Sequence, residues 1–592
     1  MTSHDCLHTV GRRPSLTRMR IIEKLVSISP FFDCIDPSDI KGELFKVEHF
    51  EPDELIFQQG DTGGKAYVVL EGIISLYELS NSRTKTPFHR ASKGSLFGTY
   101  AMLCGNARSA TAIATTESTL ASIDSDAFNQ LLDQSPRLCK RMLASIAREA
   151  SRGRTLNKGY GARRIVIRDS LNRTDSSGAE QLCDALSQSK KIDIIDKRRG
   201  TWPHEEQIAD ITRSIENERS VAFLIDEHTL ISASNLKLID ANLLLISGNE
   251  ISAQISTRKD EVVDLIRLWP SEQEKPDPLQ ERASSLTVHH VYNVRKDCQT
   301  DALRAARCIL GIATTLVLGG GGAKGFAHVG AIKALQETGA LELDLIYGVS
   351  IGSFVGMLCS FEMPWEAIYK YMRVIFVDGS PYSFSPSFHS LLQYSTGLEQ
   401  LKTDYSSFDI HDTWIPFRPL STNISRNHLT AWSAGNLLDR VIASMSIPGI
   451  LPPVQMEDGS LHVDGSVIDN LPITEARSST SGVVIAISLD HGEGQRTIPT
   501  LADSKGAIIQ WLSRAGLAKR SMPLLTDTIL YSILGAARQK SDDAEHLADC
   551  VLKPDLMSAG LLDWSCCDTA LEAGYREAKN KLQGVELQPI TN

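Results

Sequence analysis

The sequence predicts a multidomain α/β protein, and three observations support this fold class. The chain has 592 residues, enough for about three to five domains. Residues 20–135 contain short apolar runs separated by turn residues, a pattern typical of β-strands. Residues 160–285 and 286–592 instead alternate apolar strands with helical segments, which is typical of α/β domains.

The composition is that of an ordinary globular protein. Hydrophobic residues make up 42% and charged residues 22%, which excludes collagen-like, disordered and polytopic membrane chains. The net charge of −11 argues against a general nucleic-acid binder, because duplex affinity depends on neutralising phosphates. The 11 cysteines form no CxxC motif, which argues against a disulfide scaffold or a zinc ribbon.

The sequence also predicts an intracellular location. It has no window of 18 or more apolar residues, so we expect no membrane-spanning helix. The polar segment Met1–Lys24 does not resemble a secretory signal. We therefore expect a cytoplasmic protein that binds, if at all, peripherally at the inner face of the membrane.

Changes in sequence character predict the domain boundaries. We expect a first domain over residues 20–145, a small α/β module over 160–268, and a linker with a connecting helix over 269–313. The catalytic motifs lie within 314–476, and residues 477–592 are expected to complete that domain. A basic connector, Arg137–Arg173, holds 11 Lys or Arg against two acids. It is either a solvated exit helix or a patch for anionic lipid headgroups.

A glycine-rich loop follows a buried-type strand at Thr314–Leu318. The four glycines Gly319–Gly322 precede a strong helical pattern, so backbone N–H groups converge at a helix N-terminus that favours an anion. A pyrophosphate, a nucleotide phosphate or a tetrahedral oxyanion could lie there.

Two nucleotide-binding interpretations of this loop fit less well. A Walker A loop is excluded because Lys324 is followed by Gly325 and not by Ser or Thr. The dinucleotide fingerprint is met by Gly320, Gly322 and Gly325, but the acid it requires, Asp344, stands at the start of the second strand and not at its end.

Two further segments carry candidate catalytic groups. Gly348-Val349-Ser350-Ile351-Gly352 is a G-x-S-x-G sequence between an apolar run and a helical run, a context that raises the serine hydroxyl above a sheet. Asp464 ends the apolar run LHV, and the glycine after it allows a tight turn that exposes the carboxylate.

Together these three segments resemble the patatin-like phospholipase domain over about residues 314–476. The resemblance implies an α/β hydrolase domain with a mainly parallel central sheet, a Ser350 nucleophile and an Asp464 general base. The implied oxyanion hole is Gly320, Gly321 and Gly322. The matching motif positions are Gly320, Gly322, Lys324 and Gly325 in the loop, Gly348, Ser350 and Gly352 at the nucleophile, and Asp464, Gly465 and Ser466 at the base.

Two positions depart from that family's pattern. Gly319 stands where plant patatins have Asp, and Ser466 stands where the family has Gly or Ala. Neither change removes a catalytic group, so we expect them to affect loop geometry and subfamily. No metal or other cofactor is expected.

The N-terminal region resembles a cyclic nucleotide-binding domain with a β-roll. Its GSLFGTYAMLCGNARSATAIA segment matches the phosphate cassette. The resemblance implies a nucleotide site at Gly98, Thr99, Arg108 and Ser109, with Arg108 on the cyclic phosphate. Thr99 stands where the family has a ribose-binding Glu, and Ala107 replaces a Pro. Nucleotide binding and a ligand-free structural or protein-contact role are both open.

This domain order resembles the neuropathy target esterase family, and its shorter bacterial members in particular. The resemblance implies hydrolysis of lysophospholipids or phospholipids by a Ser–Asp dyad, with release of a fatty acid and no nucleic-acid partner. One alternative is a Ser-Asp-His triad with His491 or His546 as base. Another is a cyclic-nucleotide-responsive regulator with an inactive hydrolase domain. His462 would share a strand face with Asp464 two residues later.

A cluster of aromatic residues and a pair of histidines each allow more than one interpretation. Residues 361–414 hold 12 aromatic residues, which either pack in the core or form an acyl-chain groove. The pair His289–His290 is interpreted as a strand or linker feature, because no His, Cys or Asp cluster in the sequence has the spacing of metal ligands.

Overall fold

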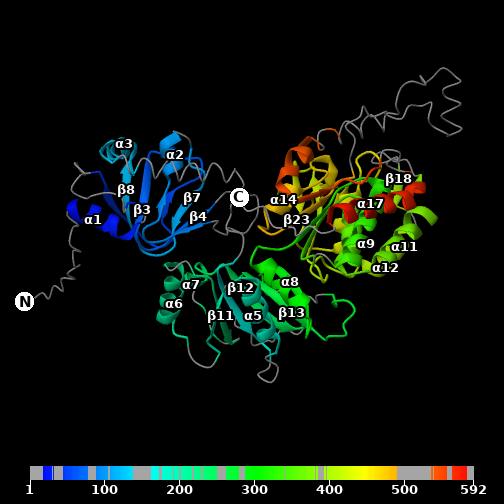
Figure 1. The fold of residues 1–592 in the computed structure, drawn as a ribbon, viewed down its shortest axis with the longest axis horizontal. Coiled ribbons are helices and arrows are strands. Elements are labelled where there is room, and N and C mark those ends of the chain that lie inside the picture. Colours follow the sequence, from blue (N-terminus) through cyan, green and yellow to red (C-terminus); the bar gives the residue numbers. More distant parts are fainter. Residues whose placement is uncertain are drawn as a thin grey trace, which may run out of the picture.

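The computed structural model of the chain contains an N-terminal β-roll, a middle α/β module and a C-terminal α/β domain (Figure 1). Most of the basic connector, and His491, lie outside the residues that the structure describes. The described residues are 18–29, 31–32, 44–77, 89–104, 107–135, 138, 162–171, 177–190, 192–198, 202–216, 219–226, 229, 231, 233–249, 262–278, 287–339, 342–379, 382–384, 392–394, 397–489, 535, 537, 539–556 and 563–582.

The N-terminal domain is built from two four-stranded antiparallel sheets. One has the order β1-β8-β3-β6 and the other β2-β7-β4-β5. Their facing side chains, including Tyr67, Val69 and Ile74, form a common core. The elements are α1 (Arg18–Ile28), β1 (Lys46–Phe50), β2 (Leu55–Phe57), β3 (Lys65–Glu71), β4 (Ile74–Tyr77), β5 (His89–Ala91), β6 (Leu96–Phe97), α2 (Thr99–Cys104), β7 (Thr111–Ala114), β8 (Ser118–Asp124) and α3 (Ser125–Gln134). The predicted N-terminal β-roll is confirmed.

The middle module is a six-stranded, all-parallel sheet with the order β10-β11-β9-β12-β13-β14. Its strands read as near-continuous apolar runs, as expected for a sheet covered on both faces. The elements are β9 (Arg164–Asp169), α5 (Ser177–Ser189), β10 (Asp193–Asp196), α6 (His204–Glu216), β11 (Val221–Asp226), α7 (Ala233–Leu236), β12 (Ala241–Ser247), β13 (Val262–Trp269), β14 (Thr287–Arg295) and α8 (Gln299–Ile309).

The predicted linker over 269–313 is therefore wrong in part. β14 pairs with β13 along most of its length and supplies the sixth strand of the module. α8 then packs its apolar face, with Ala302, Ala305 and Ile309, into the core of the same module. Apolar burial, and not only chain connection, thus fixes this segment in place.

The C-terminal domain has an eight-stranded mixed sheet with the order β21-β22-β19-β16-β15-β23-β24, and β20 pairs with β19. The central strands β19, β16, β15, β23 and β24 are parallel, whereas β20, β21 and β22 run antiparallel to their neighbours. The predicted fold class, with a mainly parallel central sheet, is confirmed. Helices α9 and α17 lie side by side in Figure 1 and pack closely against each other.

The C-terminal domain is built from strands and helices that lie before, between and after the Ser350 and Asp464 segments in the sequence. The strands are β15 (Thr315–Leu318), β16 (Leu345–Val349), β17 (Tyr382–Phe384), β18 (Leu392–Tyr394), β19 (Phe417–Asn423), β20 (His428–Ala431), β21 (Val454–Gln455), β22 (Leu461–Asp464), β23 (Val484–Ile487) and β24 (Cys550–Leu552). The helices are η3 (Gly322–Gly325), α9 (Phe326–Thr338), α10 (Ile351–Ser360), α11 (Trp365–Met372), η4 (Arg373–Asp378), α12 (Gly397–Tyr405), α13 (Leu437–Met445), η5 (Gly465–Val467), α14 (Ile473–Arg477), η7 (Glu545–Leu547), η8 (Trp564–Cys566) and α17 (Cys567–Leu582).

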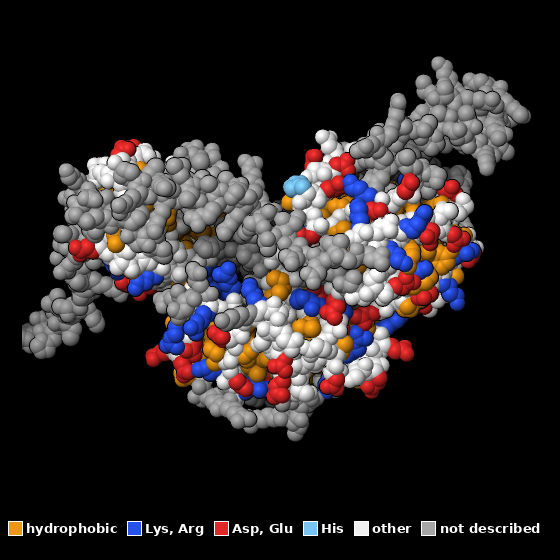
Figure 2. Space-filling view, viewed as in Figure 1, with side chains coloured by type: hydrophobic (Ala, Val, Ile, Leu, Met, Phe, Trp, Pro, Cys, Tyr) orange, Lys and Arg blue, Asp and Glu red, His pale blue; other side chains and the backbone are white. Residues whose placement is uncertain are grey.

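Charged side chains join the three domains. Arg90 of the β-roll pairs with Asp240 of the middle module. Arg267 on β13 and Asp412 of the C-terminal domain form an ion pair at 2.8 Å with both side chains fully buried. Acidic, basic and hydrophobic side chains are interspersed over the visible described surface (Figure 2). Within the described part of the chain, no helix has both the length and the apolar character required to cross a membrane.

Candidate active site

Ser350 occupies a sharp turn between β16 and α10. Its backbone has φ 54° and ψ −127°, a left-handed conformation that is uncommon for a residue with a side chain. Two residues later, a Cβ on Gly352 would lie 2.3 Å from the carbonyl oxygen of Leu318, so only glycine allows α10 to approach β15 this closely. The turn therefore raises the Ser350 side chain at the carboxyl end of the parallel strands.

The strained turn is held by hydrogen bonds on both sides of the peptide. The Ser350 N–H donates to the hydroxyl of Ser444 on α13 at 3.0 Å. Its carbonyl accepts from the Ser353 hydroxyl at 2.7 Å and from the Ser353 N–H at 2.9 Å. A conformation that costs energy by itself persists because the surrounding contacts determine it.

Asp464 ends β22 beside Ser350 and is fully buried. Its N–H donates to the Ser446 carbonyl at 2.9 Å, and its Oδ1 accepts from the Ser466 N–H at 2.9 Å. Its Oδ2 has no hydrogen-bond partner among the described residues. Burial raises the pKa of the Asp464 carboxyl to about 6, although the Ser350 hydroxyl and the Ser466 groups act to lower it.

One segment therefore aligns both groups. Ser444 holds the backbone of Ser350, and Ser446, which caps the same helix α13, holds the backbone of Asp464. Neither serine was predicted as a site residue. Their contacts run between segments that are distant in sequence, so no local pattern marks them.

The glycine-rich loop lies directly against the nucleophile. A Cβ on Gly320 would be 3.2 Å from the Cβ of Ser350 and 2.4 Å from Oδ1 of Asn470. The Gly320 N–H donates to the Asn470 carbonyl at 3.1 Å, and the Asn470 amide returns a hydrogen bond to the Gly320 carbonyl at 3.3 Å. The N–H groups of Gly321 and Gly322 donate to no described residue.

The three predicted oxyanion donors are therefore not equivalent. The N–H of Gly320 is engaged by Asn470, whereas those of Gly321 and Gly322 are available at the N-terminal end of η3 and α9. Lys324 lies within η3. Asn470 is a loop-fixing residue that the sequence showed only as part of an Asn-x-Pro motif.

A buried histidine supports the same loop from behind. His328 on α9 is fully buried, and its Nε2 bonds to the Gly319 carbonyl at 2.8 Å. Burial lowers the pKa of His328 to about 4, so the ring is neutral at physiological pH and donates from Nε2. This residue too was absent from the sequence-based predictions, since a lone histidine in a helical pattern carries no distinct signal.

No described histidine hydrogen-bonds to Ser350 or Asp464. His462 lies on β22 two residues before Asp464, as predicted. Its Nδ1, however, bonds to the Ser421 hydroxyl at 2.9 Å, and its Nε2 bonds to the Ser460 hydroxyl at 3.1 Å. His546 is exposed on η7 and bonds to a nearby backbone carbonyl.

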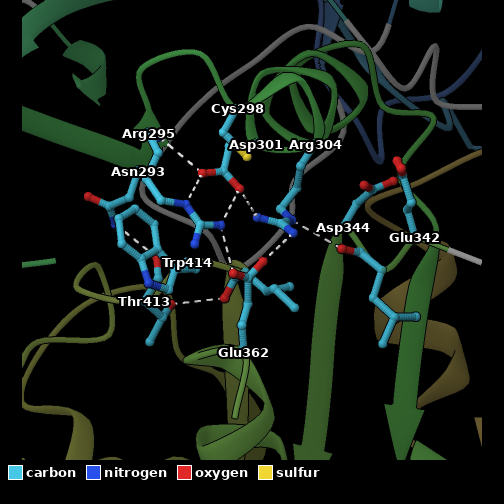
Figure 3. A network of polar contacts seen from close by, with 12 residues as sticks. Asn293, Arg295, Cys298, Asp301, Arg304, Glu342, Asp344, Glu362, Thr413 and Trp414 are labelled. Carbon is cyan, nitrogen blue, oxygen red and sulfur yellow. Dashed lines mark hydrogen bonds and ion pairs between the residues drawn. The ribbon is translucent and has the colours of Figure 1, made fainter. Parts of the chain in front are cut away.

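Charged residues of α8 form ion pairs with residues on both sides of the segment that holds Ser350, one before β16 and one after α10 (Figure 3). Arg304 bonds to Glu362, which follows α10, at 2.7 Å. Arg307 forms a two-point ion pair at 2.7 and 2.8 Å with Asp344, the buried residue that precedes β16. Figure 3 shows Arg295 and Asp301 completing the network around Glu362.

The aromatic residues after α10 divide into two groups. Phe361, Phe376 and Tyr405 are buried in the main core, and Phe376 stacks on Trp564 with ring centroids 4.6 Å apart. These rings fit the core-packing interpretation. The side chains of Tyr382, Phe384, Phe388 and Tyr394 lie outside what the structure describes, so the acyl-groove interpretation stays a prediction for them.

The predicted nucleotide site is organised around a buried arginine. Arg108 donates from Nη1 to the Gly98 carbonyl at 2.8 Å and from Nη2 to the Lys65 carbonyl at 2.7 Å, and its guanidinium lies 4.1 Å from the Phe57 ring centroid. Burial lowers the pKa of Arg108. Thr99 begins α2, and Ser109 is exposed.

Comparisons with known proteins identify two domains in the chain. The patatin-like phospholipase family model matches residues 316–477, and the cyclic nucleotide-binding domain model matches residues 47–135. Lysophospholipase nte1 of Emericella nidulans is 31% identical over 307 residues, which are 50% of this chain and 20% of that protein. Lysophospholipase NTE1 of Kluyveromyces lactis is 32% identical over 306 residues, 49% of this chain and 21% of that protein. The chain thus covers about a fifth of the length of these relatives.

One similar solved structure matches a small part of the chain. The Thermus thermophilus catabolite activator protein is 20% identical, with 27% of this chain and 68% of that chain covered and a TM-score of 0.20. A score this low carries no argument, so the assignment of the N-terminal domain rests on the family match and the strand order. The chain therefore carries a patatin-like phospholipase domain preceded by a cyclic nucleotide-binding domain, and about half of its length is similar to the two lysophospholipases.

Proposed function

We propose that this chain is a carboxylic ester hydrolase that releases a fatty acid from lysophospholipids or phospholipids. One observation carries the proposal: Ser350, in a strained turn, lies beside a buried aspartate that has one unpartnered oxygen and a raised pKa of about 6. A base of this kind can accept the serine proton near neutral pH. The lysophospholipase relatives support the substrate class.

In the proposed reaction, Ser350 Oγ attacks the ester carbonyl and its proton moves to Asp464 Oδ2. The carbonyl oxygen becomes an anion, which the free N–H groups of Gly321 and Gly322 can stabilise. The C–O bond to the glycerol oxygen then breaks, and the proton on Asp464 passes to that oxygen. Water then attacks the acyl-enzyme and gives a proton to Asp464. As the bond from the acyl carbon to Ser350 Oγ breaks, Asp464 passes that proton to Oγ, which releases the fatty acid and restores free Ser350.

In this proposal Gly320 shapes the oxyanion loop more than it donates to the anion. Its N–H would have to leave the Asn470 carbonyl to reach the substrate, whereas those of its two neighbours need no such exchange. Removing a single oxyanion donor typically costs about 2.7–4 kcal/mol of transition-state stabilisation. In this proposal the N–H groups of Gly321 and Gly322 therefore form the oxyanion hole without a third donor.

We further propose peripheral contact with a membrane surface, because the substrate class resides there. The cyclic nucleotide-binding domain suggests a cyclic nucleotide as a ligand. Arg108 would then exchange its contacts with two backbone carbonyls for the phosphate.

A fluorophosphonate probe tests the nucleophile, because it labels only an activated serine. We expect one label on the full chain, located at Ser350, and none on Ser350→Ala. Ser360→Ala is the matched control: Ser360 is a buried serine of the same helix whose hydroxyl bonds only within that helix. Fatty acid released from lysophosphatidylcholine is measured in parallel by mass spectrometry. Labelling that persists in Ser350→Ala would contradict the proposal.

A further inference from the structure

A β-bulge at the edge of the middle module places two histidines opposite one aspartate. β13 and β14 pair Val263 with Val288, and then Leu265 with Val291. Asp264 on one strand therefore faces both His289 and His290 on the other. Bulges are rare between parallel strands, and an extra residue re-aims the side chains around it.

The bulge brings the ring nitrogens of both histidines to the same carboxylate. In a regular strand, successive side chains point to opposite faces of the sheet. Here, Nδ1 of His290 lies 3.2 Å and Nδ1 of His289 lies 3.8 Å from Oδ1 of Asp264. The two ring centroids are 3.9 Å apart, and the three potential ligand atoms lie within 4.8 Å of one another.

The two distances to Asp264 are within about 0.2 Å of the edge length of a tetrahedral metal site. With metal–ligand bonds of about 2.0–2.2 Å, neighbouring ligand atoms are about 3.3–3.6 Å apart. The two distances to Asp264 lie on either side of that range. A hydrogen bond to Asp264 explains the position of the His290 ring. It does not explain the position of the His289 ring, because 3.8 Å is too long for a hydrogen bond to the same oxygen.

The surroundings also suit an exchangeable ion. The His290 N–H donates to Asp264 Oδ1 at 3.0 Å, which orients the carboxylate as a supporting hydrogen bond does in a metal site. The side chains of His289 and His290 are 38% and 30% exposed, so solvent can reach a fourth position. Imidazole and carboxylate ligands together favour zinc among the common divalent metals.

We propose that Asp264, His289 and His290 form a binding site for a divalent transition metal of the zinc class, with water as the fourth ligand. Each imidazole would bind through Nδ1 and carry its proton on Nε2. The ion would join the edge strand β14 to β13, at the start of the segment that continues into α8. This site is separate from the ester hydrolase chemistry proposed above and does not depend on it.

The test uses the full chain, stripped with a chelator and then titrated with Co²⁺ and with Zn²⁺. We expect the visible d–d bands of tetrahedral cobalt, and one bound equivalent that is absent from His289→Ala and His290→Ala. Asp264→Asn should weaken binding at least tenfold, while its amide oxygen can still accept the His290 N–H, so this variant separates metal binding from folding.

The matched control is His428→Ala, which removes a histidine of β20 outside the cluster. It should bind the same number of equivalents as the unchanged chain. Equal stoichiometry and affinity in the unchanged chain and in Asp264→Asn would overturn the proposal, as would metal uptake that falls in His428→Ala as much as in His290→Ala. Circular dichroism of each variant verifies the fold.

Discussion

Replacing Asp464, the proposed catalytic base, should make the folded protein more stable at alkaline pH while it removes activity. Asp464 is fully buried, and its pKa is raised from 3.8 to about 6, so the folded state holds its proton more tightly than the unfolded state does. Stability therefore falls as pH rises from about 4 to about 6, and the full cost is present above that range. Asp464→Asn carries no charge and escapes this cost.

The size of the effect follows from the two pKa values. One pKa unit corresponds to about 1.4 kcal/mol, so ionising Asp464 in the folded state costs about 3 kcal/mol at pH 8. Part of this cost is already present at pH 4.5, because the unfolded carboxyl is ionised there. The stability of Asp464→Asn relative to the unchanged chain should therefore improve by about 2 kcal/mol between pH 4.5 and pH 8.

Urea unfolding of the full chain, followed by tryptophan fluorescence at both pH values, measures this difference. The new amide group leaves an N–H donor where Oδ2 had no partner, but that cost is the same at both pH values and cancels. Asp458→Asn is the control, since Asp458 is exposed and its pKa is lowered by hydrogen bonds from Ser460. A stability difference that is constant with pH, or that reverses, would refute a buried base with a raised pKa.

Three further predictions concern the proposed base, the ion pair between Arg307 and Asp344, and the nucleotide site. The kcat/KM for a soluble short-chain ester should rise with pH through about 6 and then level off, as Asp464 loses its proton; a profile without this limb would exclude Asp464 as the base. Arg307→Met leaves the buried Asp344 without its ion-pair partner and should cost about 3–5 kcal/mol in the free energy of unfolding. Arg576→Met, which removes an exposed pair with Glu572, should cost less than about 1 kcal/mol and serves as its control. In calorimetry, Thr99→Glu should bind cAMP more tightly than the unchanged chain, because it restores the ribose contact implied by the family resemblance; equal or weaker binding would contradict that role for position 99.

The sequence predicted the three candidate catalytic segments, which the structure brings together, because their signals are local. A glycine loop after a strand, a G-x-S-x-G turn and an Asp-Gly turn each specify a backbone shape within a few residues. The supporting residues were missed because their roles arise from contacts between distant segments. Ser444 reaches Ser350 from another helix, and Asn470 occupies the N–H of Gly320. No local pattern encodes such pairs.

The strand β14 was missed for a different physical reason. A strand is recognised in sequence by its period of two, and the bulge at His289–His290 interrupts that period. The polar run before it, Trp269–Ser285, then suggested a linker that extended too far along the chain.

The ion pairs made by the arginines of β14 and α8 limit how far the chain can be shortened from its N-terminal side. A fragment that begins at residue 316, where the phospholipase family match starts, would lack Arg304 and Arg307 of α8 and Arg295 of β14. Asp344 would lose its ion pair with Arg307, and Glu362 would lose its ion pairs with Arg295 and Arg304. Because the fragment would lose these ion pairs together with the apolar face of α8, we expect it to be less stable than the full chain. We therefore expect the smallest independently folding fragment with the proposed active site to include β14 and α8, which pack in the middle module.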